Sequence, residues 1–304
     1  MSLEEVAKRA RKALVIGIGG GGDVIGCIPT ASYLSLFGTD TLLGGLTWER
    51  RVVDPRPGPR QIDELENITR VCEGVALANP QTRTRYGTTF TESAASSILG
   101  REVLLLDISG GVWGTVRALD RAMEKLGIDL VVGIDVGGDS LARGDEPGIQ
   151  SPLADGIMVA TLAKLKVPSV LGVIGYGSDG ELTLEELNRN IAELAARGAL
   201  LGARGATPRD LELMERIASA SATEASRLVV EAGRGKYGAY SIRAGKRSVY
   251  LTPCALVTFY FSPGHVFEFS RVSKLVAETH SLREADTILR SHGYCTELYF
   301  EEGG

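Results

Sequence analysis

The chain has 304 residues, of which 44% are hydrophobic and 23% are charged, and its formal net charge is −5. This length supports one large domain or two small ones. A mildly acidic chain without a clustered basic stripe is a poor candidate for binding nucleic acid or an anionic membrane surface, because both require many exposed cations. No stretch reaches 18 apolar residues, so we expect no membrane span.

The cysteines and the first residues predict a cytoplasmic protein. The four cysteines are scattered and form no Cys-x-x-Cys pair, which is typical of a reducing compartment and not of a disulfide framework. The first twelve residues are rich in charge and lack the apolar run of a signal peptide.

Short apolar runs bounded by glycine predict buried parallel strands, and longer stretches with helical spacing alternate with them. In chain order the predicted strands are 13–18, 42–46, 103–108, 130–134 and 170–174, and the predicted helices are 24–37, 116–126, 156–165 and 184–196. This alternation predicts right-handed crossovers. We therefore expect an α/β fold with a doubly wound, mainly parallel sheet of Rossmann-like type and helices on both faces.

Two polar segments, 52–60 and 79–91, are predicted to be long loops that cover a site. After residue 204 the pattern changes to two helices, 207–220 and 222–231, followed by strands at 237–240 and 248–261. No Pro/Ser-rich linker separates this part of the chain. We therefore predict a single domain over residues 1–304, with 205–304 as its C-terminal extension.

The first predicted strand ends in a glycine-rich turn with a G-x-G-x-x-G pattern at Gly17, Gly19 and Gly22. Glycines let a ligand approach the backbone closely, and a following helix offers free N–H groups to a phosphate. Asp23 stands where a pyrophosphate would lie, so it is either a helix cap or part of a site that also holds a cation. The predicted phosphate-binding residues are Gly19, Gly20, Gly21 and Gly22.

Acidic residues follow several other predicted strands, and they belong to turns that a helix cap alone could explain. Because the carboxyl ends of parallel strands share one edge of a sheet, we expect these groups to meet in one crevice. The carboxylates predicted to gather there are Asp23, Glu49, Asp107, Asp135, Asp139 and Asp179. Glu49 is also the displaced candidate for binding a ribose in a dinucleotide site.

Carboxylates crowded in one crevice repel one another and recruit a counter-ion, and oxygen ligands favour Mg²⁺ over zinc. We predict that Asp135 and Asp139 bind the metal and, with Asp23, form the catalytic group. Further predicted ligand-binding residues are Gly137, Gly138, Ser140 and Arg143, the last as the cation for an anionic substrate group. Asp155 is either a helix cap, which is the favoured interpretation, or a member of the site.

Three segments of the chain resemble an uncharacterised, mostly archaeal family that is catalogued as domain of unknown function 1152. They are the Gly19–Asp23 turn, Gly44–Arg50 with the Pro-rich loop after it, and Gly133–Ser140 extended through Ser151–Asp155. The resemblance implies a Rossmann-like α/β fold. It implies no reaction and no catalytic residue.

The leading hypothesis is an Mg²⁺-dependent enzyme that acts on a phosphorylated or nucleotide-like small molecule. The first alternative is an oxidoreductase that binds a nicotinamide or flavin dinucleotide through the G-x-G-x-x-G turn. The second is a non-catalytic protein that binds a metabolite. A homo-oligomer is a further open alternative, since the apolar segment 249–261 could form an interface, although a core strand is its plainer interpretation.

Overall fold

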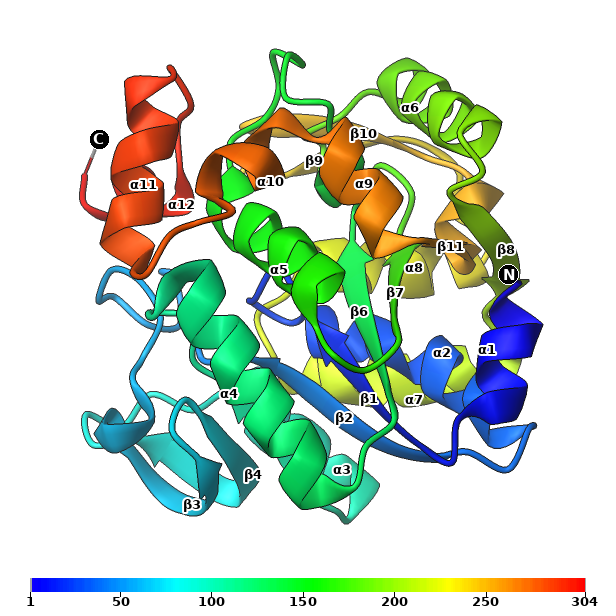
Figure 1. The fold of residues 1–304 in the computed structure, drawn as a ribbon. Helices are drawn as coiled ribbons and strands as arrows, with labels where there is room; N and C mark the ends of the chain where they lie inside the picture. Colours follow the sequence, from blue (N-terminus) through cyan, green and yellow to red (C-terminus); the bar gives the residue numbers. More distant parts are fainter. Residues whose placement is uncertain (1, 304) are drawn as a thin grey trace.

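A nine-stranded mixed sheet runs through the middle of the protein in the computed structural model, which describes residues 2–303 (Figure 1). Its strands are β1 (Lys12–Gly17), β2 (Asp40–Leu46), β3 (Leu65–Cys72), β4 (Val75–Thr84), β5 (Val103–Leu106), β6 (Leu130–Val136), β7 (Ser169–Ile174), β8 (Leu200–Gly205) and β11 (Val257–Phe261). They are arranged in the order β3-β4-β5-β2-β1-β6-β7-β11-β8.

The five central strands, from β5 to β7, are all parallel. The chain places β2 and β5 on one side of β1 and then returns to place β6 and β7 on the other side. The predicted doubly wound, mainly parallel sheet is therefore confirmed. Ligands of such sheets bind outside the carboxyl ends of the two strands where the order reverses, which here are β1 and β6.

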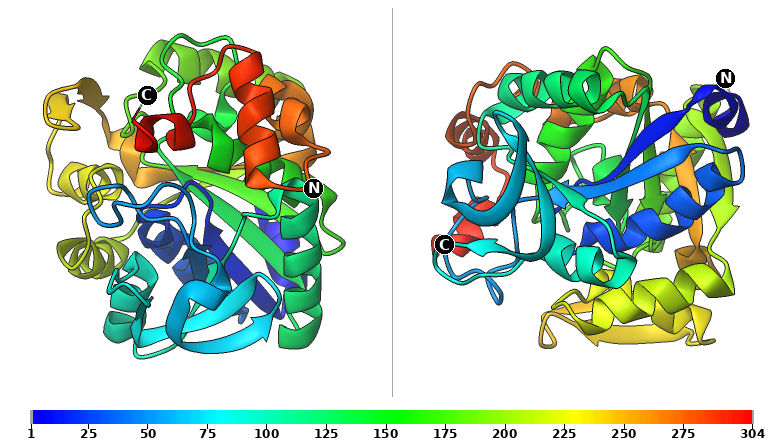
Figure 2. Two further views of the ribbon diagram at one scale, coloured as in Figure 1. Left: turned by 90° about the vertical axis from the view of Figure 1, so that its left-hand side faces the viewer. Right: turned by 90° about the horizontal axis from the view of Figure 1, so that it is seen from below.

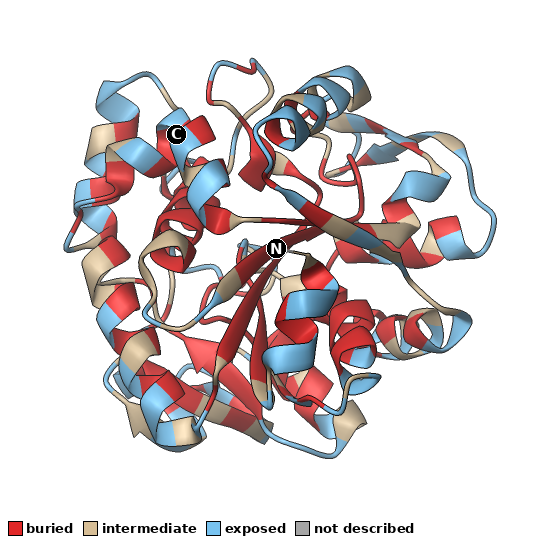
Figure 3. Ribbon diagram, turned by 45° about the vertical axis from the view of Figure 1, so that its right-hand side comes forward, coloured by how far each residue is buried: buried red, intermediate tan, exposed pale blue. Residues whose placement is uncertain are grey.

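Helices cover both faces of the sheet, as predicted. They are α1 (Leu3–Arg9), α2 (Cys27–Ser35), α3 (Thr91–Leu99), α4 (Gly111–Leu126), α5 (Pro152–Lys164), α6 (Leu184–Ala196), α7 (Pro208–Ser219), α8 (Ala225–Gly233), α9 (Pro263–Phe269), α10 (Arg271–Val276), α11 (Leu282–Ser291) and α12 (Glu297–Glu301). On β1, Leu14 and Ile16 share a core with α4, α5 and α9, whereas Ala13 and Val15 pack with α2, α3 and α7. This alternation explains why the strand sequence is apolar throughout, and Figure 3 shows the buried sheet between the two layers.

The first helix after the glycine-rich turn begins later than predicted. A 3₁₀ turn, Asp23–Gly26, comes before α2. Gly26 lies so close to β6 that a methyl group there would be 2.5 Å from a methyl carbon of Val136. Because the 3₁₀ turn packs closely against β6, the glycine-rich turn before it lies next to the end of β6.

The prediction of a loop over 79–91 is wrong for 79–84, because β4 extends through Thr84 and pairs with β3 as an antiparallel hairpin, whereas 85–90 do form the connection to α3. Of the eight residues of β3, which lies at the edge of the sheet, only Leu65 is buried. The apolar runs that mark the buried strands are therefore missing from this hairpin, which explains the error. The segment 52–60 does lack regular structure, as predicted.

The predicted strand 248–261 is in fact two strands that belong to different sheets. Strands β9 (Gly238–Ile242) and β10 (Arg247–Leu251) form a separate hairpin, and β11 joins the main sheet between β7 and β8. A 3₁₀ turn, Pro253–Leu256, separates the two parts. Pro253 lacks the N–H group that a continuous strand would need at this position.

The four C-terminal helices return to the face that carries α4 and α5, so that α12 lies beside the segment after β2 (Figure 2). In residues 2–303, no helix combines the length and the apolar character that crossing a membrane requires.

Candidate functional site

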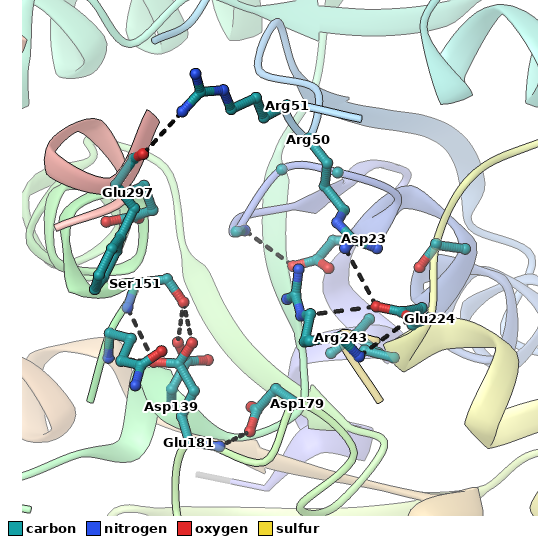
Figure 4. A pocket seen from close by; sticks show the side chains of 18 of the residues that line it. Asp23, Arg50, Arg51, Asp139, Ser151, Asp179, Glu181, Glu224, Arg243 and Glu297 are labelled. Atoms are coloured by element: carbon teal, nitrogen blue, oxygen red, sulfur yellow. Dashed lines mark hydrogen bonds and ion pairs between the residues drawn. The ribbon is translucent and has the colours of Figure 1, made fainter. Parts of the chain in front are cut away.

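A cavity of about 760 Å³ opens at the carboxyl ends of β1 and β6, the position that the strand order indicates. Its walls come from the turn after β1, the segment after β2, the ends of β6 and β7, the β9–β10 hairpin and α12 (Figure 4). The sequence-predicted residues that line it are Gly19, Gly20, Gly21, Asp23, Glu49, Asp135, Asp139 and Asp179. Loops that are distant in the chain therefore do meet at one edge.

Three carboxylates in this cavity lie close enough to share one cation. Asp135, Asp139 and Asp155 each offer an oxygen within 4.8 Å of the others. Asp135 is near the end of β6, Asp139 begins the 3₁₀ turn Asp139–Leu141, and Asp155 comes from the first turns of α5. We call these three residues the carboxylate triad.

Neighbouring groups orient the members of the triad to different degrees. The backbone N–H of Ser140 donates to Asp135 Oδ2 over 3.1 Å, and the Ser140 hydroxyl donates to the same oxygen. Ser151 Oγ lies 3.5 Å from Asp139 Oδ2. Asp155 is only 6% exposed, yet its Oδ1 has no hydrogen-bond partner among residues 2–303. An acceptor that is buried without a donor lacks the compensation that such groups normally have.

The interpretation of Asp155 as a helix cap is wrong. Asp155 is the fourth residue of α5, and the N-terminus of the helix is capped from elsewhere. The carboxylate of Glu297, from α12, accepts hydrogen bonds from the N–H groups of Leu153 (2.9 Å) and Ala154 (2.8 Å). Because Glu297 satisfies these donors, the side chain of Asp155 is left to face the cavity.

Further acidic side chains surround the triad, and with it they form what we call the acidic wall. Its members are Asp23, Asp135, Asp139, Asp155, Asp179, Glu181 and Glu297. One oxygen of Asp179 accepts from the N–H of Glu181 at 2.7 Å, while its buried Oδ2 has no hydrogen-bond partner in the described chain.

Burial and mutual repulsion raise the pKa values of four aspartates in this wall. Burial raises the pKa of Asp135 to about 6, although the hydrogen bonds from Ser140 oppose the shift. Burial and the nearby Glu181 and Asp135 raise the pKa of Asp179 to about 8. The pKa values of Asp139 and Asp155 lie well above the usual range, because both are buried and each repels other carboxylates.

The repulsion is large enough to require compensation. Two ionised carboxylates no more than 4.8 Å apart repel by about 3.5 kcal/mol or more at an effective dielectric constant of about 20. A folded protein can avoid this cost by protonating some of the groups or by binding a cation between them. The triad is the only such group of His, Cys, Asp or Glu found in the described part of the chain.

The glycine-rich turn adjoins the triad, but its donors are partly used within the protein. Gly19 N–H donates to Asp23 Oδ2 and Gly21 N–H donates to the carbonyl of Trp48, both over 2.9 Å. Gly20 has φ +77°, and a methyl group there would lie 2.7 Å from the Trp48 carbonyl oxygen. The glycines are thus explained in large part by the left-handed backbone and by the close approach of the segment after β2.

Several predicted site residues lie outside the lining of the cavity. Gly22, Gly137, Gly138 and Ser140 stand behind it, and a methyl group on Gly137 would overlap the carboxylate of Asp179. Glu49 does line the cavity, but its Oε1 accepts from the N–H of Thr91, the first residue of α3. Glu49 therefore has a structural role at the start of that helix.

Asp107 and Arg143 are not brought to the cavity either. Asp107 accepts a hydrogen bond from Ser109 N–H at 2.8 Å in the turn after β5, two strands away from β1. Arg143 forms an ion pair with Glu193, and its guanidinium lies over the ring of Phe269. These contacts with Glu193 and Phe269 explain why the guanidinium of Arg143 does not reach the cavity.

The sequence reasoning missed several lining residues that the structure brings in. Asp155 is not among them, because the sequence already offered it as the alternative to a helix cap; the signal is an ionisable residue in a helix that is otherwise almost entirely apolar. No local signal marks the others, which come from the C-terminal half or from the segment after β2. They are Arg50, Arg51, Glu181, Glu224, Arg243, Lys246, Arg247, Glu297 and Glu301.

The fold and the cavity together define an α/β protein of the doubly wound class with an acidic pocket at its topological switch point. A family model described as "Protein of unknown function (DUF1152)" matches residues 14–303, and the chain belongs to this family. A comparison with curated proteins found no match.

Proposed function

We propose that this protein is a divalent-cation-dependent enzyme that acts on a phosphorylated or nucleotide-like small molecule. Asp135, Asp139 and Asp155 would hold the cation, for which Mg²⁺ is the leading candidate. The observation that carries this proposal is the Oδ1 atom of Asp155, buried without a hydrogen-bond partner in the described chain beside two other carboxylates. A bound cation would compensate both the buried acceptor and the repulsion.

The donor atoms favour a hard cation. All three members of the triad offer carboxylate oxygens, which suit Mg²⁺, Mn²⁺ and Ca²⁺. No histidine or cysteine lines the cavity in residues 2–303, so the nitrogen and sulfur ligands typical of zinc are missing. The cavity volume is also of the size that accommodates a small-molecule substrate.

When bound, the cation would polarise a phosphoryl or carbonyl oxygen and lower the pKa of a bound water. Asp179 is the best-placed residue to carry a proton, since its Oδ2 is buried without a partner among the described residues and the side chain lines the cavity. Asp23 is already engaged with Gly19 N–H and would therefore hold the turn in place. These roles describe metal-assisted hydrolysis or group transfer on an anionic substrate.

The dinucleotide alternative has less support. Two of the four glycine N–H groups already have acceptors, Asp23 occupies the turn, and Glu49 is bonded to Thr91. A dinucleotide bound through its pyrophosphate at the turn would have to compete with all three. Purified protein that carries flavin or nicotinamide absorbance would restore this alternative.

The experiment has a binding arm and an activity arm. Protein freed of metal with EDTA and dialysed is titrated with Mn²⁺ and Mg²⁺ by calorimetry, and then tested for turnover on a panel of phosphate esters and nucleotides. Asp139→Asn should weaken cation binding at least tenfold, and Asp107→Asn is the matched control that should not. Equal cation binding by wild type and Asp139→Asn would overturn the metal site. Binding of cation and ligand without turnover would favour the non-catalytic alternative.

A further inference from the structure

The cavity also carries three arginines from two segments that are distant in the sequence. Arg50 follows β2, while Arg243 and Arg247 belong to the β9–β10 hairpin. Figure 4 shows Arg50 and Arg243 near each other across the cavity from Asp139. We call Arg50, Arg243 and Arg247 the arginine cluster.

The carboxylates that form ion pairs with the arginine cluster are fewer than its guanidinium groups. Glu224 Oε2 is shared between Arg50 Nη2 at 3.2 Å and Arg243 Nε at 3.8 Å. Arg247 Nη1 forms an ion pair of 2.9 Å with Glu181. Glu181 in turn accepts hydrogen bonds from other groups, among them the backbone N–H of Gln150. Three guanidinium groups thus share two carboxylates.

The guanidinium of Arg243 is the least satisfied of the three. Its Nε is buried and donates no hydrogen bond within residues 2–303. Burial and the proximity of Arg50 and Arg247 lower the pKa of Arg243. A buried donor next to like charges is stabilised by an anion that accepts from it.

The backbone at the hairpin tip holds Arg243 in an uncommon conformation. Arg243 and Ala244 have φ values of +55° and +54°, and the tip is closed by a hydrogen bond from Gly245 N–H to the Ile242 carbonyl over 3.1 Å. The left-handed region costs about 1 kcal/mol or more for each non-glycine residue, and such residues cluster at ligand sites. Asparagine or glycine would be the cheaper residue at these positions.

We infer that the arginine cluster is the phosphate subsite of this cavity and binds the phosphate or pyrophosphate group of the substrate. This inference rests on the proposed function and deepens it. Planar guanidinium groups bind phosphate oxygens in pairs, which the partly occupied donors of the glycine-rich turn cannot match. The substrate is then a phosphate or pyrophosphate ester that lies between the arginine cluster and the triad, with its phosphate on the hairpin side.

The test uses pyrophosphate as the probe and is carried out in EDTA, so that it does not depend on a cation. Calorimetric titration of the full-length protein should show binding that Arg243→Gln weakens about tenfold or more, the effect of losing a charge-assisted hydrogen bond. Arg143→Gln removes an arginine outside the cavity and should leave the affinity unchanged. Equal affinity of wild type and Arg243→Gln, or no binding by wild type, would overturn the subsite.

A second variant separates binding from folding. Arg243→Gly removes the guanidinium but suits the φ of +55°, so it should keep or raise the melting temperature while lowering pyrophosphate affinity as much as Arg243→Gln does. Mn²⁺ titration of the same proteins and of Asp139→Asn distinguishes the two proposals. If Mn²⁺ binding requires the triad but pyrophosphate binding does not change when Arg243 is replaced, only the phosphate subsite is refuted. Pyrophosphate binding that needs Arg243, without any Mn²⁺ binding, refutes only the metal-dependent function.

Discussion

Replacing Asp155 by asparagine should stabilise the metal-free protein, and a cation should remove most or all of that advantage. The variant keeps the volume of the side chain and removes one charge from the triad. In metal-free protein at pH 8 it relieves part of a repulsion of about 3.5 kcal/mol. Because some of these groups are protonated, we expect the free energy of unfolding to rise by about 1–3 kcal/mol.

With the cation present the wild type should gain more stability than the variant. At a cation concentration of about 100 Kd the wild type gains about 2.7 kcal/mol, and a hundredfold loss of affinity reduces the gain to about 0.4 kcal/mol. For a chain of 304 residues each kcal/mol corresponds to about 1.5 °C in the melting temperature. The wild type should therefore shift by about 4 °C and Asp155→Asn by less than about 1 °C.

Differential scanning calorimetry in EDTA and then in Mg²⁺ or Mn²⁺ measures both effects. Asp107→Asn is the control, because Asp107 also follows a parallel strand but lies outside the cavity. It should keep the full cation-dependent shift. The reasoning is refuted if Asp155→Asn melts at a lower temperature than wild type in EDTA, or if it retains the wild-type response to the cation.

Three further results are expected. The metal-free protein should lose stability as the pH rises from about 5 to about 9. Carboxyls with raised pKa values, such as Asp179 at about 8, bind more protons in the folded state than in the unfolded state. Urea unfolding over this pH range measures the effect, and a rise in stability would contradict the prediction. Gly137→Ala should lower the free energy of unfolding by more than about 2 kcal/mol, because the added methyl group overlaps the carboxylate of Asp179. Gly87→Ala is also at positive φ but has open space around it, so it should lower the free energy of unfolding by only about 1 kcal/mol. Equal melting temperatures of the two variants would contradict this. Glu301→Gln weakens the acceptor that holds the buried indole N–H of Trp48 and the N–H of Gly58, so it should lower the free energy of unfolding by about 1 kcal/mol and change the tryptophan fluorescence; an unchanged emission spectrum would count against this link.

The central sheet and the place of the site could be predicted from the sequence because both depend on local patterns. Continuous apolar runs such as 103–106 and 130–134 mark strands buried on both faces. Once strands and helices alternate, the crossover rule places all the parallel strand ends on one edge. Asp135 and Asp139 follow one such strand, so their position near the glycine-rich turn was predictable without coordinates.

The edge hairpin β3–β4 escaped prediction for a physical reason. The edge strand β3 buries only Leu65 and needs no apolar run, so its place is decided by pairing with its neighbour β4, which in turn pairs with β5, and not by its own composition. The residues of β11 were predicted as part of a strand, but local pattern does not fix its place between β7 and β8, where the chain returns to the sheet after the separate β9–β10 hairpin.

The sequence by itself determined which turns would carry acidic groups and at which edge they would meet. Only the tertiary structure decided which charges face the cavity. Asp155 faces it because Glu297, which contacts the start of α5 from more than 140 residues away, caps that helix in its place. Arg243 faces it and Arg143 does not, because ion pairs and ring contacts between distant elements orient long side chains, and no local pattern encodes such contacts.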